Sequence, residues 1–225
     1  MKKKCLLYFV LIFTMTFWVA CRQQNKPDQT TQNQADTTTT DTIPNAQPKT
    51  IENYFQQLKA QNYFKVAQGD TIRVDTLDIP NGFMQINYRD AEVKDLTKVT
   101  LTLWNKRKSG KDLVGVLFRR CTVNCAFKDP VFLEFDTDNY QDVTDTHYPQ
   151  NLKAYLKRRL NDYAKTCRTA SPFNAALLPQ QGVDVQLVVM SHGNYGNPPC
   201  PQALIGILKY DGDGFTFIEP VGREE

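Results

Sequence analysis

The sequence has almost no excess of charge of either sign. It holds 27 lysines and arginines against 24 aspartates and glutamates, and three of these lysines, Lys2 to Lys4, lie in the acid-free first 20 residues. Without those three, the chain carries 24 basic and 24 acidic side chains. A neutral chain does not attract a polyanion, so we expect no nucleic-acid partner. The cluster Lys106-Arg107-Lys108 is interpreted as a solvated hairpin tip.

Signature motifs of enzymes and calcium loops are also missing. There is no GxSxG nucleophile elbow. The stretch DTDNYQDVTD fails as an EF-hand because its sixth and twelfth positions are Gln141 and His147 instead of glycine and glutamate. We interpret this stretch as a loop that leads into a helix. Calcium remains an alternative there, with four possible carboxylate ligands: Asp136, Asp138, Asp142 and Asp145.

What is present begins with an apolar N-terminus. After Met1 and three lysines, 16 mostly apolar residues run from Cys5 to Ala20. A spanning helix needs about 20 apolar residues, because the hydrocarbon core is about 30 Å thick. A basic start, a short apolar core and a small residue at the boundary predict a cleaved signal peptide over residues 1–20.

The next segment is polar. Residues 22–49 are rich in Gln, Thr, Asn and Asp and offer little apolar surface to offset the entropy lost on ordering. We therefore expect residues 21–50 to form a flexible tether. Residues 51–225 are enough for one folded domain, and they contain no internal repeat.

The boundary Val19-Ala20-Cys21 resembles the lipobox of bacterial lipoproteins, although Trp18 stands where a leucine-like residue is usual. The resemblance implies cleavage before Cys21 and attachment of palmitate-type acyl chains to that residue. Such chains hold a protein on a membrane without a spanning helix. We expect a lipid anchor in the cell envelope, at the outer membrane. The periplasmic face is favoured because no acidic run follows Cys21.

Two later stretches strengthen the resemblance. LLPQQGVDVQLVV followed by LIGILKYDGDGFTF, and NGFMQINY followed by a strand that ends in Trp104, are similar to the C-terminal part of uncharacterised bacterial lipoproteins. That family implies an envelope location and no known reaction.

Periodicity predicts an α+β fold of mostly antiparallel hairpins. Apolar residues at helical spacing predict an N-terminal helix from residue 51 and a longer helix at about 149–166. Alternating apolar residues, among them Val99, Leu101 and Leu103, predict a β meander whose first strand has a shift of phase. Asn81-Gly82 and the Asp-Gly pairs at 211–214 predict turns in it. The expected strands and hairpins cover residues 71–79, 81–90, 98–118, 130–137, 182–191 and 203–220.

Four cysteines follow the predicted tether, and an even number in an oxidising compartment favours disulfides. Three pairings are possible, and we favour Cys121–Cys125 with Cys167–Cys200. The alternative is a zinc site in which these thiols act with His192. Only one short cysteine spacing is present, whereas structural zinc sites usually have two.

The loop SHGNYGNPPC is the best candidate site, because loops rich in Gly and Pro often present binding surfaces. We expect a binding loop formed by Ser191, His192, Tyr195 and Asn197. A hydrolase that uses Ser191, His192, Cys200 and Asp142 is the alternative. Adjacent residues of an extended strand point to opposite faces, which works against a pair of Ser191 and His192.

The sequence therefore favours a lipid-anchored, non-catalytic binding module. We expect no cofactor, no metal and no reaction, and a protein, peptide or glycan as the partner. Such a module should expose an apolar patch or groove. A structural or assembly lipoprotein is the second interpretation.

Overall fold

The computed structural model describes residues 48–105, 107–121, 125–149, 151–167, 172–192 and 200–220. These residues belong to one compact unit that begins at residue 46. The predicted signal peptide, Cys21 and nearly all of the predicted tether lie outside the described residues.

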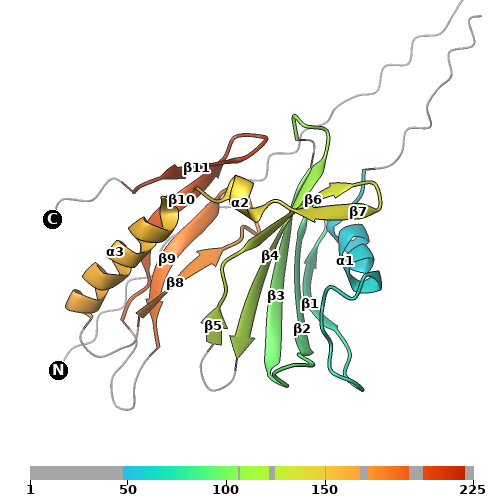
Figure 1. The fold of residues 1–225 in the computed structure, drawn as a ribbon, viewed down its shortest axis with the longest axis horizontal. Coiled ribbons are helices and arrows are strands. Elements are labelled where there is room, and N and C mark those ends of the chain that lie inside the picture. Colours follow the sequence, from blue (N-terminus) through green and yellow to red (C-terminus); the bar gives the residue numbers. More distant parts are fainter. Residues whose placement is uncertain are drawn as a thin grey trace, which may run out of the picture. The chain divides into compact units, whose positions relative to one another are not determined.

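The larger sheet has seven strands, and every pairing in it is antiparallel (Figure 1). Helix α1 (Ile51–Ala60) precedes it. The strand order is β1-β2-β3-β4-β6-β7, and β5 also pairs with β4. These strands are β1 (Arg73–Asp78), β2 (Phe83–Arg89), β3 (Leu96–Trp104), β4 (Asp112–Cys121), β5 (Cys125–Phe127), β6 (Val131–Asp136) and β7 (Asn139–Asp142).

The smaller sheet is built from the C-terminal part of the chain. Helices α2 (Thr144–His147) and α3 (Leu152–Thr166) lead into it. Its antiparallel order is β11-β10-β9-β8. Its strands are β8 (Pro172–Leu177), β9 (Val185–Ser191), β10 (Ala203–Tyr210) and β11 (Phe215–Ile218). The predicted α+β class with mostly antiparallel strands is confirmed.

Two predicted turns are found where glycine was expected to permit them. At the β1–β2 turn, Gly82 has a φ of +62° and donates its amide hydrogen to the carbonyl of Ile79. Few other residues adopt this backbone conformation readily. At the β10–β11 turn, the Asp211 carboxylate accepts hydrogen bonds from the amides of Asp213 and Gly214.

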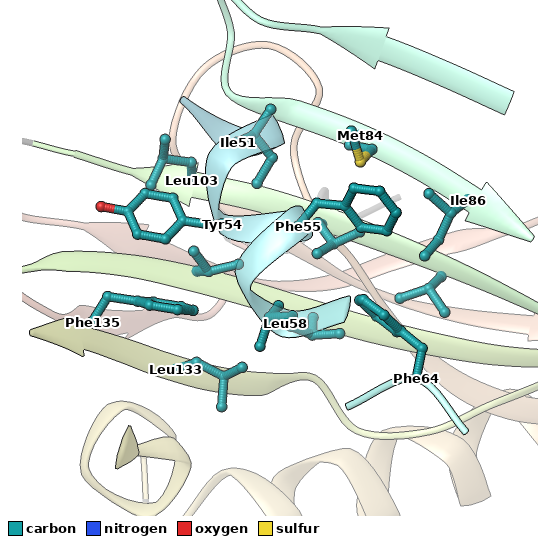
Figure 2. Close-up of a cluster of buried hydrophobic side chains, with 14 of the residues drawn as sticks. Ile51, Tyr54, Phe55, Leu58, Phe64, Met84, Ile86, Leu103, Leu133 and Phe135 are labelled. Atoms are coloured by element: carbon teal, nitrogen blue, oxygen red, sulfur yellow. The ribbon is translucent and has the colours of Figure 1, made fainter. Parts of the chain in front are cut away.

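The first core lies between α1 and one face of the larger sheet (Figure 2). The helix presents four buried side chains at the predicted spacing, Ile51, Tyr54, Phe55 and Leu58. Strand β3 presents Val99, Leu101 and Leu103 to the same cluster. A capping box between Thr50 and Asn53 satisfies orphan groups at the start of the helix, which fixes its position over the sheet.

The second core forms where the other face of this sheet meets the α2–α3 region and the smaller sheet. The central part of the larger sheet is therefore buried on both faces, and even Thr97 and Thr102 of β3 are only 1% exposed. Gly115 makes room for an indole ring here, because a Cβ at that position would lie 2.8 Å from Trp104. The indole nitrogen donates to the carbonyl of Val183 at 2.8 Å.

The boundaries and four elements differ from the sequence-based expectation. The longer helix begins at Leu152, three residues after Pro149, and its basic residues Lys153 and Lys157 are exposed as expected. The stretch interpreted as a loop contains strand β7 and helix α2. Strands β5 and β8 were also missed. β5 and β7 are only three and four residues long, and such elements form through pairing with a neighbour more than through their own periodicity.

Candidate functional site

The predicted binding loop is only partly described. Ser191 is the last residue of β9, and its Oγ accepts a hydrogen bond from the amide of Cys200 at 2.8 Å. His192 follows it and stacks on the ring of Phe173, with ring centroids 4.5 Å apart. Tyr195 and Asn197 lie outside the described residues. Ser191 and His192 therefore both make contacts that support the local fold.

Cys200 is joined to Cys167 by a disulfide, the second of the two predicted pairs. The bond ties the end of α3 to the segment before β10, with a Cα–Cα distance of 6.2 Å that is normal for a disulfide. Cys121 and Cys125 face each other as register partners in β4 and β5. The Cys125 side chain lies outside the described residues, so that pairing stays a prediction.

The alternative hydrolase site is not assembled among the described residues. Asp142 belongs to β7 of the larger sheet, where its carboxylate accepts hydrogen bonds from the amide and hydroxyl of Thr144. Ser191 belongs to the smaller sheet, His192 follows it, and Cys200 is in a disulfide. Within the described ranges, no group of three or more His, Cys, Asp and Glu side chains is placed to hold a metal.

An aromatic column joins the two sheets beside the predicted loop. Arg119 of β4 lies over the ring of Phe127 at 5.4 Å, and Phe127 stacks on Phe173 at 5.6 Å. Phe173 in turn stacks on His192. This column gives His192 a packing role. Its members are far apart in the sequence, so no local pattern revealed it.

The interpretation of Lys106-Arg107-Lys108 as a solvated tip is wrong for the central residue. The Arg107 side chain is only 4% exposed. Its Nη1 donates to Glu134 at 2.7 Å, and its Nη2 donates to the carbonyl oxygen of Asp213 at 2.6 Å and lies 3.2 Å from the carboxylate of Asp213. Lys108 is exposed, as expected. The acceptors come from distant parts of the chain, which explains why the local sequence did not predict burial.

Two titratable groups of this ionic cluster have shifted pKa values. Hydrogen bonds from Lys111 and Arg107 lower the pKa of the Glu134 carboxyl below its ordinary value. Burial, with the charge of Arg107 adding to it, lowers the pKa of His147. The cluster connects the β3–β4 turn, β6 and the β10–β11 turn, so we interpret it as a structural junction between the sheets.

The edge strand β1 offers the clearest accessible surface. It pairs only with β2 among the described strands, so its outer side lacks a neighbouring strand there. Val74 is 50% exposed and Leu77 is 42% exposed. Their register partners, Ile86 and Met84, belong to the first core, so the two exposed side chains share the face that α1 covers farther along the sheet.

A hollow of about 380 Å³ lies at the end of β1. Ile79 and Val183 contribute apolar surface to it, and both are more than 40% exposed. The first described residues of the chain, Pro48 to Thr50, also line it. We call Val74, Leu77, Ile79 and Val183 together the β1 edge surface. The sequence had predicted β1 as a strand, and its phase shift matches the register irregularity between Val74 and Thr76.

Comparison with known proteins adds no relative: no protein-family model, curated protein or solved structure matches this chain. Among the residues that the structure describes, no helix is both long and apolar enough to cross a bilayer.

Proposed function

We propose that this protein is a lipid-anchored, non-catalytic binding module of the bacterial cell envelope, and that it docks an extended segment of a partner protein on the β1 edge surface. The anchor would be acylated Cys21 at the outer membrane, on its periplasmic face. The Val19-Ala20-Cys21 pattern and the polar segment behind it support this part of the proposal.

One observation carries the docking proposal. Eight large apolar side chains are markedly exposed in the described residues, and four of them make up the β1 edge surface. Scattered exposed apolar residues are normal, but a group of them at an unpaired edge marks an interaction site. Val74 and Leu77 lie on β1, Ile79 directly follows that strand, and Val183 lines the same hollow as Ile79. The remaining four, which are Val93, Leu96, Leu204 and Ile218, are spread over both sheets.

An edge strand selects an extended partner for a physical reason. The backbone N–H and C=O groups on its outer side are not paired with another of the described strands. An extended segment that adds to the sheet as a further strand can form hydrogen bonds with all of them. Alternate side chains of the added strand would then lie beside Val74 and Leu77, where apolar contact favours binding. Backbone pairing contributes affinity, and the apolar face contributes selectivity.

The anchor is tested with Cys21→Ala in the full chain. We expect the unaltered protein to incorporate a palmitate analogue and to sediment with outer membranes, and the variant to do neither. Cys5→Ala is the matched control, since Cys5 lies within the predicted signal peptide. Labelling that survives Cys21→Ala would overturn the lipid anchor.

Docking is tested in the intact envelope with a photoreactive phenylalanine analogue in place of Leu77, and with Leu204 as the matched exposed control. We expect a defined covalent adduct from position 77 and none from position 204. The adduct should disappear when Val74→Lys is added and persist when Ile218→Lys is added. An adduct between two copies of this chain would favour the assembly role, and insensitivity to Val74→Lys would overturn docking on β1.

A further inference from the structure

A second site lies on the α1 face of the larger sheet, beyond the C-terminal end of the helix. It is a pocket of about 150 Å³, which we call the tyrosine pocket. Its lining includes Tyr63, Tyr88, Asp90, Phe118, Arg120 and Lys128. Tyr88 comes from β2, Phe118 and Arg120 from β4, and Tyr63 follows α1.

The two tyrosine hydroxyls are available as donors. Neither Tyr63 nor Tyr88 has a hydroxyl hydrogen-bond partner among the described residues, although Tyr88 is only 2% exposed. Burial raises the pKa of Tyr88 to about 12, and burial also raises the pKa of Tyr63. Both groups are therefore protonated at neutral pH and can donate a hydrogen bond to a ligand in the pocket.

Two cationic residues, Arg120 and Lys128, also line this pocket. Nη2 of Arg120 lies 3.8 Å from the Asp90 carboxylate, a distance too long for a strong hydrogen bond. The other oxygen of Asp90 accepts from the amides of Glu92 and Val93, so this carboxylate is already held by the backbone. Lys128 has no ion-pair partner among the described residues, and its amide donates to the carbonyl of Phe118.

The pocket's charge balance favours an anion. Three cationic residues line it against two carboxylates, and one of those cations, Lys65, is neutralised by Glu92. One oxygen of Asp90 is held by backbone amides and the other lies 3.8 Å from Arg120, so Arg120 and Lys128 together exceed the charge of Asp90 by one. Two neutral donors and two cations, with acceptors already occupied, form a site in which a ligand oxyanion has several partners.

Size and apolar walls narrow the class of anion. Pockets for whole drug-sized ligands measure about 300 to 1,000 Å³, so this one is large enough only for one end of a ligand. The ring of Tyr63 lies 6.0 Å from that of Phe118, and both rings offer apolar surface beside the donors. A planar carboxylate on a short apolar stem matches this combination better than a fully solvated phosphate does.

We propose that the tyrosine pocket binds a carboxylate carried on a short apolar stem, with Tyr63, Tyr88 and Arg120 as its recognition groups. Two sources share this chemistry, an acidic side chain of a peptide and a small free organic acid. The site is separate from the β1 edge surface, so it does not depend on docking there.

The test is an NMR titration of the full chain in detergent micelles, with ¹³C-labelled tyrosine rings. Glutarate serves as the small acid, a glutamate-containing tripeptide amide as the peptide, and inorganic phosphate as the competing anion. Tyr63→Phe and Tyr88→Phe assign the two ring signals. We expect glutarate or the tripeptide to shift both signals saturably. Saturation by the tripeptide at lower concentration would identify a peptide source, and the reverse a free acid.

Arg120→Met should weaken this binding at least about tenfold, because a charge-assisted hydrogen bond is lost. Arg119→Met is the matched control, since it removes one positive charge from the adjacent position of β4, and it should leave affinity unchanged within about twofold. Absence of carboxylate-induced shifts, preference for phosphate, or an equal effect of the two arginine variants would overturn the proposal. Thermal melting of each variant verifies that it is folded.

Discussion

Arg107 lies on the turn before β4 and Arg120 lies at the far end of that strand, and the two side chains differ in burial and in ionic contacts. The Arg107 side chain is 4% exposed and satisfies Glu134 and Asp213 with short contacts. The Arg120 side chain is 32% exposed, and its only ion-pair contact among the described residues is 3.8 Å long. Both are arginines that follow a basic residue directly, so residue type alone does not distinguish them.

The difference lies in what the fold brings to each guanidinium. The β3–β4 turn is met by β6 and by the β10–β11 turn, which supply acceptors at bonding distance. At the other end of β4, the nearby carboxylate of Asp90 is held by backbone amides instead. Both terminal nitrogens of Arg107 have acceptors and so support structure, whereas Arg120 has one long ion pair among the described residues and can bind a ligand.

Among the variants proposed here, Arg107→Ala should lower the free energy of unfolding most. Removing Arg107 from this buried ionic cluster leaves Asp213 without its cation and Glu134 with Lys111 alone, so we expect the free energy of unfolding to fall by about 3 kcal/mol. Denaturant titration of the variant measures this change. A loss as small as that expected for Arg120 would show that the junction does not stabilise the fold.

Acidification should weaken the same junction in two steps. The pKa of folded His147 is below its ordinary 6.5, so the unfolded chain takes up the proton first and stability falls as the pH drops below that value. The pKa of folded Glu134 is below 4.5, so its contribution is lost as the pH falls further.

Denaturant titrations across this pH range, with His147→Phe and Glu134→Gln, separate the steps. The first variant should flatten the upper part of the pH profile, and the second the lower part. A wild-type stability that is constant from pH 7 to pH 4.5 would contradict the assignment of His147, and one that is constant below pH 4.5 would contradict that of Glu134.

Arg120→Met should change stability far less, by no more than about 0.5 kcal/mol, because its long contact with Asp90 lies at a partly exposed site. The same variant should lose carboxylate binding, which separates stability from recognition. Denaturant titration and the NMR titration, performed on one preparation, measure both. A stability loss comparable to that of Arg107→Ala would show that Arg120, like Arg107, stabilises the fold.

Lys108→Ala, on the same turn as Arg107, should change the free energy of unfolding least. Its side chain is exposed and takes part in no ion pair among the described residues, so we expect no measurable change in unfolding free energy. This variant is the charge-matched control for Arg107→Ala. A measurable loss would mean that net charge on the turn, and not the buried contacts of Arg107, supports the junction.

Much of the local structure could be predicted because its cause is local. Alternation of Val99, Leu101 and Leu103 identified strand β3. The Asn81-Gly82 pair identified the turn between β1 and β2. Helix α3 followed from apolar residues on one face. Strand β8 was not predicted because its sequence, PFNAAL, has no clear alternation of apolar and polar residues. It forms through its pairing with β9.

The candidate sites were predicted less well. The sequence directed attention to Ser191 and His192, which the fold engages through an amide hydrogen bond and a ring stack. The β1 edge surface was foreseen only as an unspecified apolar patch. The tyrosine pocket was not foreseen, because its residues come from β2, β4 and three connecting segments.

The sequence by itself determined the type and order of most helices and strands, because turn chemistry and apolar spacing act over a few residues. Tertiary structure alone decided that Arg107 is buried, that the side chains of β1 stay exposed, and that Tyr63 and Arg120 meet in one pocket. These outcomes depend on which strand lies at a sheet edge and which acceptors arrive from distant segments. Burial and pairing are properties of the assembled sheets, and no local pattern contains them.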